Sequence, residues 1–122
     1  MTSRHARRIP EYLQHILDAI DRAIQYVEGM DLQAFELDAR TQDAVIRSIE
    51  IVGEAANKTR MADPTFTAGA PHIPWDAMYG MRNRIVHDYF EVDIEIVWQT
   101  VQQDLPALRK QIKELLPLAS KL

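Results

Sequence analysis

The sequence has no cysteine, no long apolar run and few signals for β-strands, and each of these absences excludes a class of protein. Without cysteine there can be neither disulfide bonds nor thiolate metal sites. No apolar run approaches the length of a membrane-spanning helix. The basic N-terminus is not followed by the uninterrupted apolar segment of a secretory signal. We therefore expect a cytoplasmic protein that does not contact a membrane.

Positive charge is also scarce, with a net charge of -4 and a pI near 5.5. This balance argues against a nucleic-acid coat protein, which needs a broad basic surface, and we expect no DNA partner. The net negative charge is nevertheless compatible with a nuclease that has a local basic cleft. The 122 residues suit a single domain, 1–122.

Apolar residues recur with helical spacing through most of the chain. A first helix is predicted from Ile9, with Pro10 in its first turn and Gly29 near its end. Residues 31–38 are predicted to connect the first helix to the second, with the side chains of Leu32 and Phe35 anchored in the core. A second helix is predicted from Asp38 or Thr41 to Arg60, and its apolar stripe is Val45, Ile49, Val52 and Ala56.

Residues 61–75 are rich in proline and are predicted to form a loop before a third helix, which begins near Pro74 with Asp76 in its first turn. The last apolar pattern runs from Ile94 to Leu115. Pro106 inside it either kinks one helix or starts another with Asp104 as the N-cap. The predicted fold class is all-α, an antiparallel up-and-down bundle of four to five helices.

The segment from Trp75 to Phe90 concentrates polar and aromatic residues at one helix end. Asn83 and His87 are four residues apart and can lie side by side. Arg82 and His87 are five apart, so a straight helix places them on different faces. A joint role requires either that the helix ends near Val86 or that a second copy of the chain completes the site.

This set of residues has the chemistry for cleaving RNA without a metal. Histidine can act as the general acid or base near neutral pH, and arginine can stabilise the charge that develops on phosphorus. Asn83 can hold the imidazole or bind a phosphate oxygen. Tyr89 adds a hydroxyl and a stacking face. The candidate catalytic residues are therefore Arg82 and His87, supported by Asn83 and Tyr89, with no metal or cofactor.

Structural roles are the alternative for several of these residues. A histidine near a helix end commonly caps the helix, and Arg84 fits a solvated surface charge. Tyr79 and Phe90 fit core or interface aromatics. The other histidines have no metal-ligand spacing: His5, His15 and His72. The basic arm of Arg4, Arg7 and Arg8 fits a solvated terminus.

The pattern Arg-x4-His-x-Tyr, with asparagine directly after the arginine, resembles the signature of the HEPN superfamily and, more narrowly, its HepT branch. The resemblance rests on Arg82, Asn83, His87 and Tyr89, preceded by the segments 73–75 and 80–81. The segments 97–98 and 104–106 also resemble that branch.

The resemblance implies a HEPN-like bundle that forms a homodimer through the motif-bearing face, so that two motifs make one RNA-cutting cleft. Trp75, Trp98 and Met78 are the apolar residues expected to be spare for this contact. The implied protein is a metal-independent endoribonuclease and toxin, acting on tRNA or mRNA. Its implied antitoxin is an MntA-like nucleotidyltransferase that silences it by transferring AMP to Tyr89.

Two other classes of function are compatible with the sequence. The first is an inert HEPN domain that binds nucleotides or serves as a scaffold for a nucleotidyltransferase, although a scaffold has no need of both Arg82 and His87. The second is a helical interaction protein in which the motif only caps a helix and pairs charges.

Overall fold

The computed structural model of the chain describes residues 8–87 and 92–121, and all regular structure in these ranges is helical. The elements are α1 (Ile9–Tyr26), α2 (Leu32–Glu36), α3 (Ala39–Ala62), α4 (Pro64–Ala68), α5 (Trp75–His87), α6 (Ile94–Gln99), a π-helical turn (Thr100–Asp104) and α7 (Leu105–Ala119). The all-α prediction is confirmed. In the described ranges no helix combines the length and apolar character needed to cross a bilayer.

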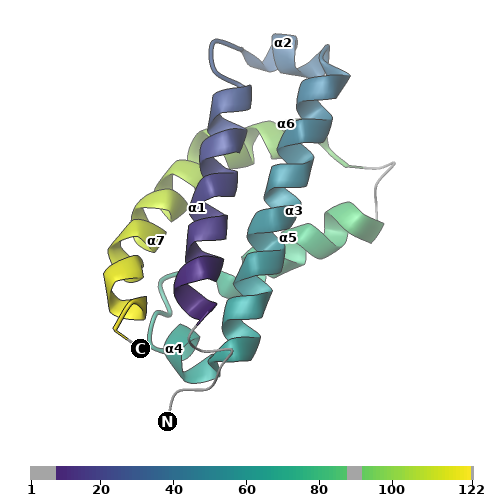
Figure 1. The fold of residues 1–122 in the computed structure, drawn as a ribbon. Helices are drawn as coiled ribbons and strands as arrows, with labels where there is room; N and C mark the ends of the chain where they lie inside the picture. Colours follow the sequence, from purple (N-terminus) through teal and green to yellow (C-terminus); the bar gives the residue numbers. More distant parts are fainter. Residues whose placement is uncertain (1–7, 88–91, 122) are drawn as a thin grey trace.

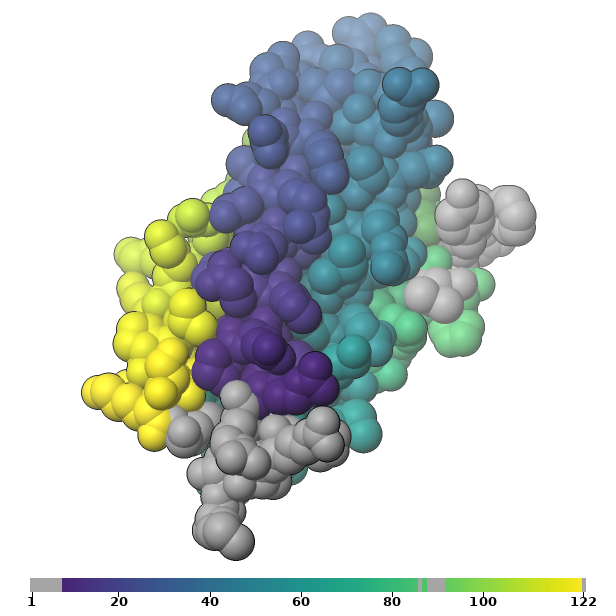
Figure 2. All heavy atoms as spheres, viewed as in Figure 1, coloured from purple at the N-terminus to yellow at the C-terminus, as the bar shows by residue number. Residues whose placement is uncertain are grey.

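The two long helices α1 and α3 lie side by side and form the centre of the molecule (Figure 1). Helix α7 packs on α1, and α5 packs on α3 at the opposite flank. Figure 2 shows from the same side that α1 and α3 form the front face between α7 and α5. Consequently α5 has one main packing partner, and the seam between α3 and α5 lies at the edge of the bundle.

Local sequence signals fix the ends of α1 and α3. Pro10 lies in the first turn of α1, and Gly29 adopts a φ of 79° in the turn that follows this helix, as predicted. Asp38 caps α3, because its carboxylate accepts hydrogen bonds from the backbone N–H of Thr41 at 3.0 Å and from the Thr41 hydroxyl at 2.7 Å. These bonds lower the pKa of Asp38.

The predicted apolar stripes form the core. The second stripe is buried at every position, and Phe35 anchors the connection between α1 and α3 with a fully buried ring. Phe35 also packs against the indole of Trp98, with the ring centroids 5.3 Å apart. The buried members of the last pattern are Val97, Val101, Leu105, Leu108, Ile112 and Leu115.

Both segments that were predicted as plain connections contain a short helix. Asp31 caps α2 by accepting from the Ala34 N–H at 2.8 Å, and Asp63 caps α4 by accepting from the Phe66 N–H at 3.0 Å. An aspartate satisfies a free N–H at a helix start. The sequence pattern misses these helices because a single turn is too short to display a period.

Pro106 does not separate the last helix into two. The backbone stays helical from α6 through the π-helical turn into α7, and Asp104 has helical angles (φ -76°, ψ -43°) with no side-chain capping bond. Of the two predicted alternatives, the structure excludes a new helix capped by the Asp104 side chain and leaves one continuous helical segment. A proline inside an α-helix lacks an N–H and clashes with the carbonyl four residues earlier, and the wider turn before Pro106 accommodates both effects.

Candidate active site on helix α5

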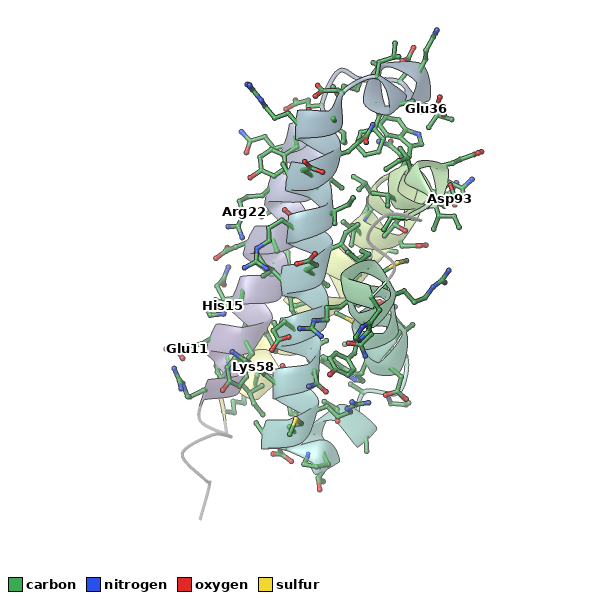
Figure 3. All side chains as sticks on the ribbon, turned by 90° about the vertical axis from the view of Figure 1, so that its right-hand side faces the viewer. Glu11, His15, Arg22, Glu36, Lys58 and Asp93 are labelled. Atoms are coloured by element: carbon green, nitrogen blue, oxygen red, sulfur yellow. The ribbon has the colours of Figure 1, made fainter. Side chains whose placement is uncertain are left out.

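Helix α5 carries three of the four predicted site residues: Arg82, Asn83 and His87. Figure 3 shows α3 between α1 and α5, with His15 on α1 and Lys58 on the side of α3 that faces α1. Met78 and Ile85 are buried and attach α5 to the core. The position of the Arg82 side chain therefore depends on how α5 packs on α3.

A glycine brings the two helices together at Arg82. A Cβ atom added at Gly53 would lie 2.4 Å from the Cβ of Arg82 and 2.6 Å from the carbonyl oxygen of Met78. Real Cβ atoms essentially never approach other atoms so closely. The missing side chain at this point of α3 thus permits the close contact and fixes where Arg82 leaves α5.

Three groups hold the Arg82 guanidinium. Its Nε lies 3.3 Å from a carboxylate oxygen of Glu54 on α3, and its Nη1 donates to Asn83 Oδ1 at 2.9 Å. Its central carbon lies 5.9 Å from the ring centroid of Tyr79. With 29% of its side chain exposed, Arg82 is oriented by these contacts and still open to solvent.

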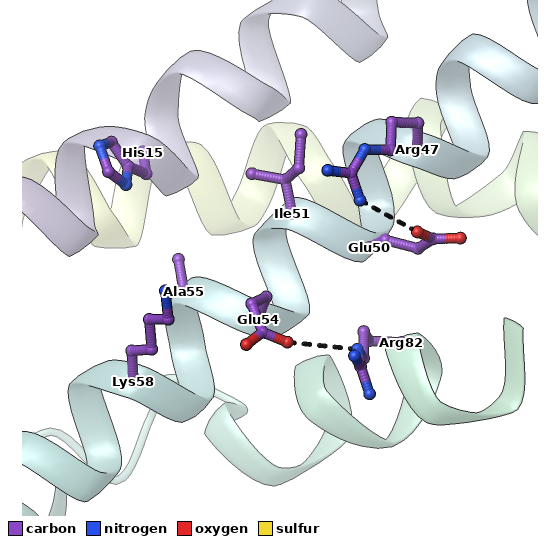
Figure 4. Close-up of a pocket in the computed structure, with 8 residues that line it drawn as sticks. All are labelled: His15, Arg47, Glu50, Ile51, Glu54, Ala55, Lys58 and Arg82. Atoms are coloured by element: carbon purple, nitrogen blue, oxygen red, sulfur yellow. Dashed lines mark hydrogen bonds and ion pairs between the residues drawn. The ribbon is translucent and has the colours of Figure 1, made fainter. Parts of the chain in front are cut away.

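Arg82 lines a hollow of about 360 Å³ that opens between α1, α3 and α5 (Figure 4). A hollow of this size is at the lower end of ligand pockets. Its charged and titratable lining comprises His15, Arg47, Glu50, Glu54, Lys58 and Arg82. Glu50 pairs with Arg47 at 3.2 Å, and Glu54 pairs with Arg82. The hollow is mixed in charge, with cationic side chains at both of its ends.

His87 does not meet Arg82 within the chain. It is the last residue of α5 and is exposed, and in the described ranges it makes no hydrogen bond or ion pair. The structure ends α5 at His87, one residue beyond the expected end near Val86, and His87 itself is part of the helix. Five helical residues correspond to a rotation of about 140° and a rise of about 7.5 Å. The two side chains therefore project in different directions.

The predictions for Asn83, for Tyr89 and for the absence of a metal site compare with the structure as follows. Asn83 contacts Arg82, and no hydrogen bond joins it to His87 in the described part of the chain. The predicted role of Tyr89 falls outside the described residues. Among the residues that the structure describes, no three histidine or acidic side chains are grouped so as to hold a metal ion.

The apolar residues that were expected to be spare for a dimer are used inside the chain. Trp75 is 7% exposed and donates its indole N–H to the Ala70 carbonyl at 3.2 Å, and Met78 is also buried. Trp98 packs against Phe35. Trp75 and Met78 are thus not spare for an interface, whereas Trp98 is half-buried and keeps some exposed surface.

Sequence reasoning missed Glu54 and assigned Tyr79 to the core or an interface, whereas both contact Arg82. Glu54 belongs to a different helix, so no spacing within the motif indicates it. One available signal was Gly53, a glycine inside a predicted helix. Such a glycine often marks a close approach of two backbones.

Comparison with known proteins identifies the class. The sequence model described as "Ribonuclease HepT-like" matches residues 16–115. A protein of Thermococcus cleftensis named probable ribonuclease HepT is 36% identical over 105 residues, which cover 86% of this chain and 93% of that protein. A protein of Caldanaerobacter subterraneus subsp. tengcongensis named as a putative RNase is also 36% identical over 105 residues, covering 86% of this chain and 91% of that protein.

The match of the family model spans most of the chain, and both relatives are covered almost end to end. The chain therefore belongs to the HepT-like ribonuclease family. No solved structure matches it at a comparable level of significance.

Proposed function

We propose that this chain is a metal-independent endoribonuclease and the toxin of a toxin–antitoxin pair. The observation that carries the proposal is the orientation of Arg82 at the rim of an open hollow by Glu54, Asn83 and Tyr79. A guanidinium has more N–H donors than these contacts use, so Arg82 retains donors for a phosphate. A cation that is already oriented toward the phosphate needs little reorganisation when negative charge develops on phosphorus in the transition state.

In this mechanism Arg82 binds the scissile phosphate and stabilises its extra negative charge in the transition state. His87 transfers the proton, either from the attacking ribose 2′-hydroxyl or to the leaving oxygen. Asn83 supports Arg82. The substrate is an unpaired segment of tRNA or mRNA, since only an accessible ribose can be aligned for this attack.

The separation of Arg82 and His87 on α5 supports a site shared by two chains. A two-fold axis beside α5 would bring the His87 of one copy toward the Arg82 of the other. In such an isologous contact the same surface of both copies meets, so each pair of residues is formed twice. Arg82 and His87 both have exposed side-chain surface, which such an arrangement needs. The proposed active unit is therefore a homodimer.

Control of the toxin is proposed to act through Tyr89. A nucleotidyltransferase antitoxin would transfer AMP from ATP to the hydroxyl of Tyr89, and pyrophosphate would be released. The added phosphate is an anion two residues from His87 and would compete with RNA for Arg82.

After co-expression with such a partner, peptide mass analysis should find AMP on Tyr89. Neutralisation of a Tyr89→Phe chain to the same extent would contradict this route.

The direct test of the proposed chemistry is cleavage of RNA by the purified chain with all divalent metal removed. We expect cleavage in EDTA at the rate seen with Mg²⁺ present, because arginine and histidine supply the charge and the proton transfer that a metal would otherwise supply. Gel analysis of total RNA and of a defined oligonucleotide measures the rate. Loss of cleavage in EDTA with recovery on adding Mg²⁺ would contradict the mechanism.

A further inference from the structure

A second arginine on the seam between α3 and α5 is held in the same way as Arg82. Arg60 pairs through Nη1 with the carboxylate of Asp76, and its Nη2 donates to Asn57 Oδ1 at 2.8 Å. Its guanidinium carbon lies 5.7 Å from the ring centroid of Tyr79. Each arginine therefore has one carboxylate, one asparagine oxygen and the same aromatic ring as partners.

Both guanidinium groups lie close to the ring of Tyr79, which limits the distance between them. The guanidinium carbons lie 5.7 Å and 5.9 Å from its centroid, so they are within about 12 Å of each other. A nucleic acid strand advances about 3.4 Å per nucleotide along a duplex axis, and further when it is extended. A strand whose phosphate is bound at Arg82 can thus bring another phosphate to Arg60 within about three nucleotides.

The existing partners do not prevent Arg60 from binding an anion. Its side chain is 38% exposed, and that of Asp76 is 87% exposed. An ion pair this open to water contributes little to stability, so a phosphate can replace or join it at little cost. The asparagine and the ring keep the guanidinium oriented while this exchange takes place.

We propose that Arg60 is a second phosphate-binding residue for the RNA strand, and that Tyr79 is the positioning residue that fixes its distance from Arg82. The inference rests on the proposed ribonuclease function and extends it. The substrate is then recognised by at least two phosphates along the α3–α5 seam. A molecule with a single phosphate would use only the site at Arg82.

Binding tests this inference without any cleavage. Arg60→Gln is compared with its parent in the His87→Ala background by the fluorescence anisotropy of a labelled single-stranded RNA at several salt concentrations. The lost phosphate contact should make the negative slope of log K against log salt about 0.7 less steep. It should also weaken binding about ten-fold at low salt.

The matched control is Arg109→Gln. Arg109 is also 38% exposed and bound to a carboxylate, Asp21, but it lies on the α1–α7 side of the bundle. It should leave the slope unchanged. An Arg60→Gln slope equal to that of the parent, or equal losses in the two variants, would overturn the proposal.

Cleavage separates phosphate binding from a structural role. With His87 intact, Arg60→Gln should lower kcat/KM about ten-fold on an oligonucleotide and leave it unchanged on a dinucleoside monophosphate, which has one phosphate. Equal losses on both substrates would mean that Arg60 acts only by supporting Tyr79 and Arg82, and would overturn the inference. If the unaltered chain cleaves neither substrate, the proposed function fails, while the salt slope still decides the role of Arg60.

Discussion

His87→Ala and Arg82→Ala are each expected to lower RNA cleavage by about 100-fold or more, because each removes one part of the charge and proton-transfer chemistry. The fold should survive both changes. His87 is exposed at a helix end, and the partly exposed Arg82–Glu54 ion pair contributes at most about 1 kcal/mol. Single-turnover cleavage and thermal unfolding measure the two effects separately.

Neighbouring residues of the same types provide the controls. Arg84 is exposed two residues from Arg82 on α5, and His72 is exposed in the loop before that helix. Arg84→Ala and His72→Ala should retain cleavage within a few-fold. Full activity in His87→Ala would contradict the mechanism, as would a loss in Arg84→Ala as large as that in Arg82→Ala.

Gly53→Ala is expected to impair both stability and activity. The new Cβ would need about 1 Å more room from the Cβ of Arg82 to reach an ordinary carbon contact. It would also meet the backbone oxygen of Met78, which cannot rotate away. Overpacking of this kind costs about 1–3 kcal/mol, and the helix-propensity gain of alanine offsets about 1 kcal/mol of that cost. A displacement of about 1 Å at Arg82 is expected to lower the rate about 100-fold.

Gly80→Ala is the matched control on the facing helix. A Cβ at Gly80 meets nothing within 4 Å. This variant should therefore raise the free energy of unfolding by about 0.5–1 kcal/mol and keep its activity. Denaturant unfolding and cleavage assays on both variants decide the matter. A Gly53→Ala chain as stable and as active as its parent would show that the close contact at Gly53 does not position Arg82.

Much of the fold could be predicted from the chain because its signals are local. Period and capping residues marked the longer helices, and Asp38 and Pro10 lie where helix starts require them. The two one-turn helices gave no period. The π-helical turn that accommodates Pro106 depends on the packing of the whole last segment. No residue within Thr100–Asp104 indicates this turn in the sequence.

The candidate site was only partly predictable, because its partners come from two helices. The motif on α5 indicated Arg82, Asn83 and His87, and the structure places all three on that helix. The contact of Arg82 with Glu54 depends on how α3 and α5 pack, which spacing within α5 cannot reveal. Trp75 was misassigned for a similar reason, since its burial depends on the turn at Ala70.

The most direct test of the account is RNA cleavage by a mixture of the His87→Ala and Arg82→Ala chains, unfolded and refolded together so that subunits exchange. A shared site predicts that the mixture cleaves RNA in EDTA far faster than either variant alone. The reason is that a mixed dimer contains one intact Arg82 opposite one intact His87. A mixture as inactive as its two components, from chains that fold and associate normally, would contradict the account.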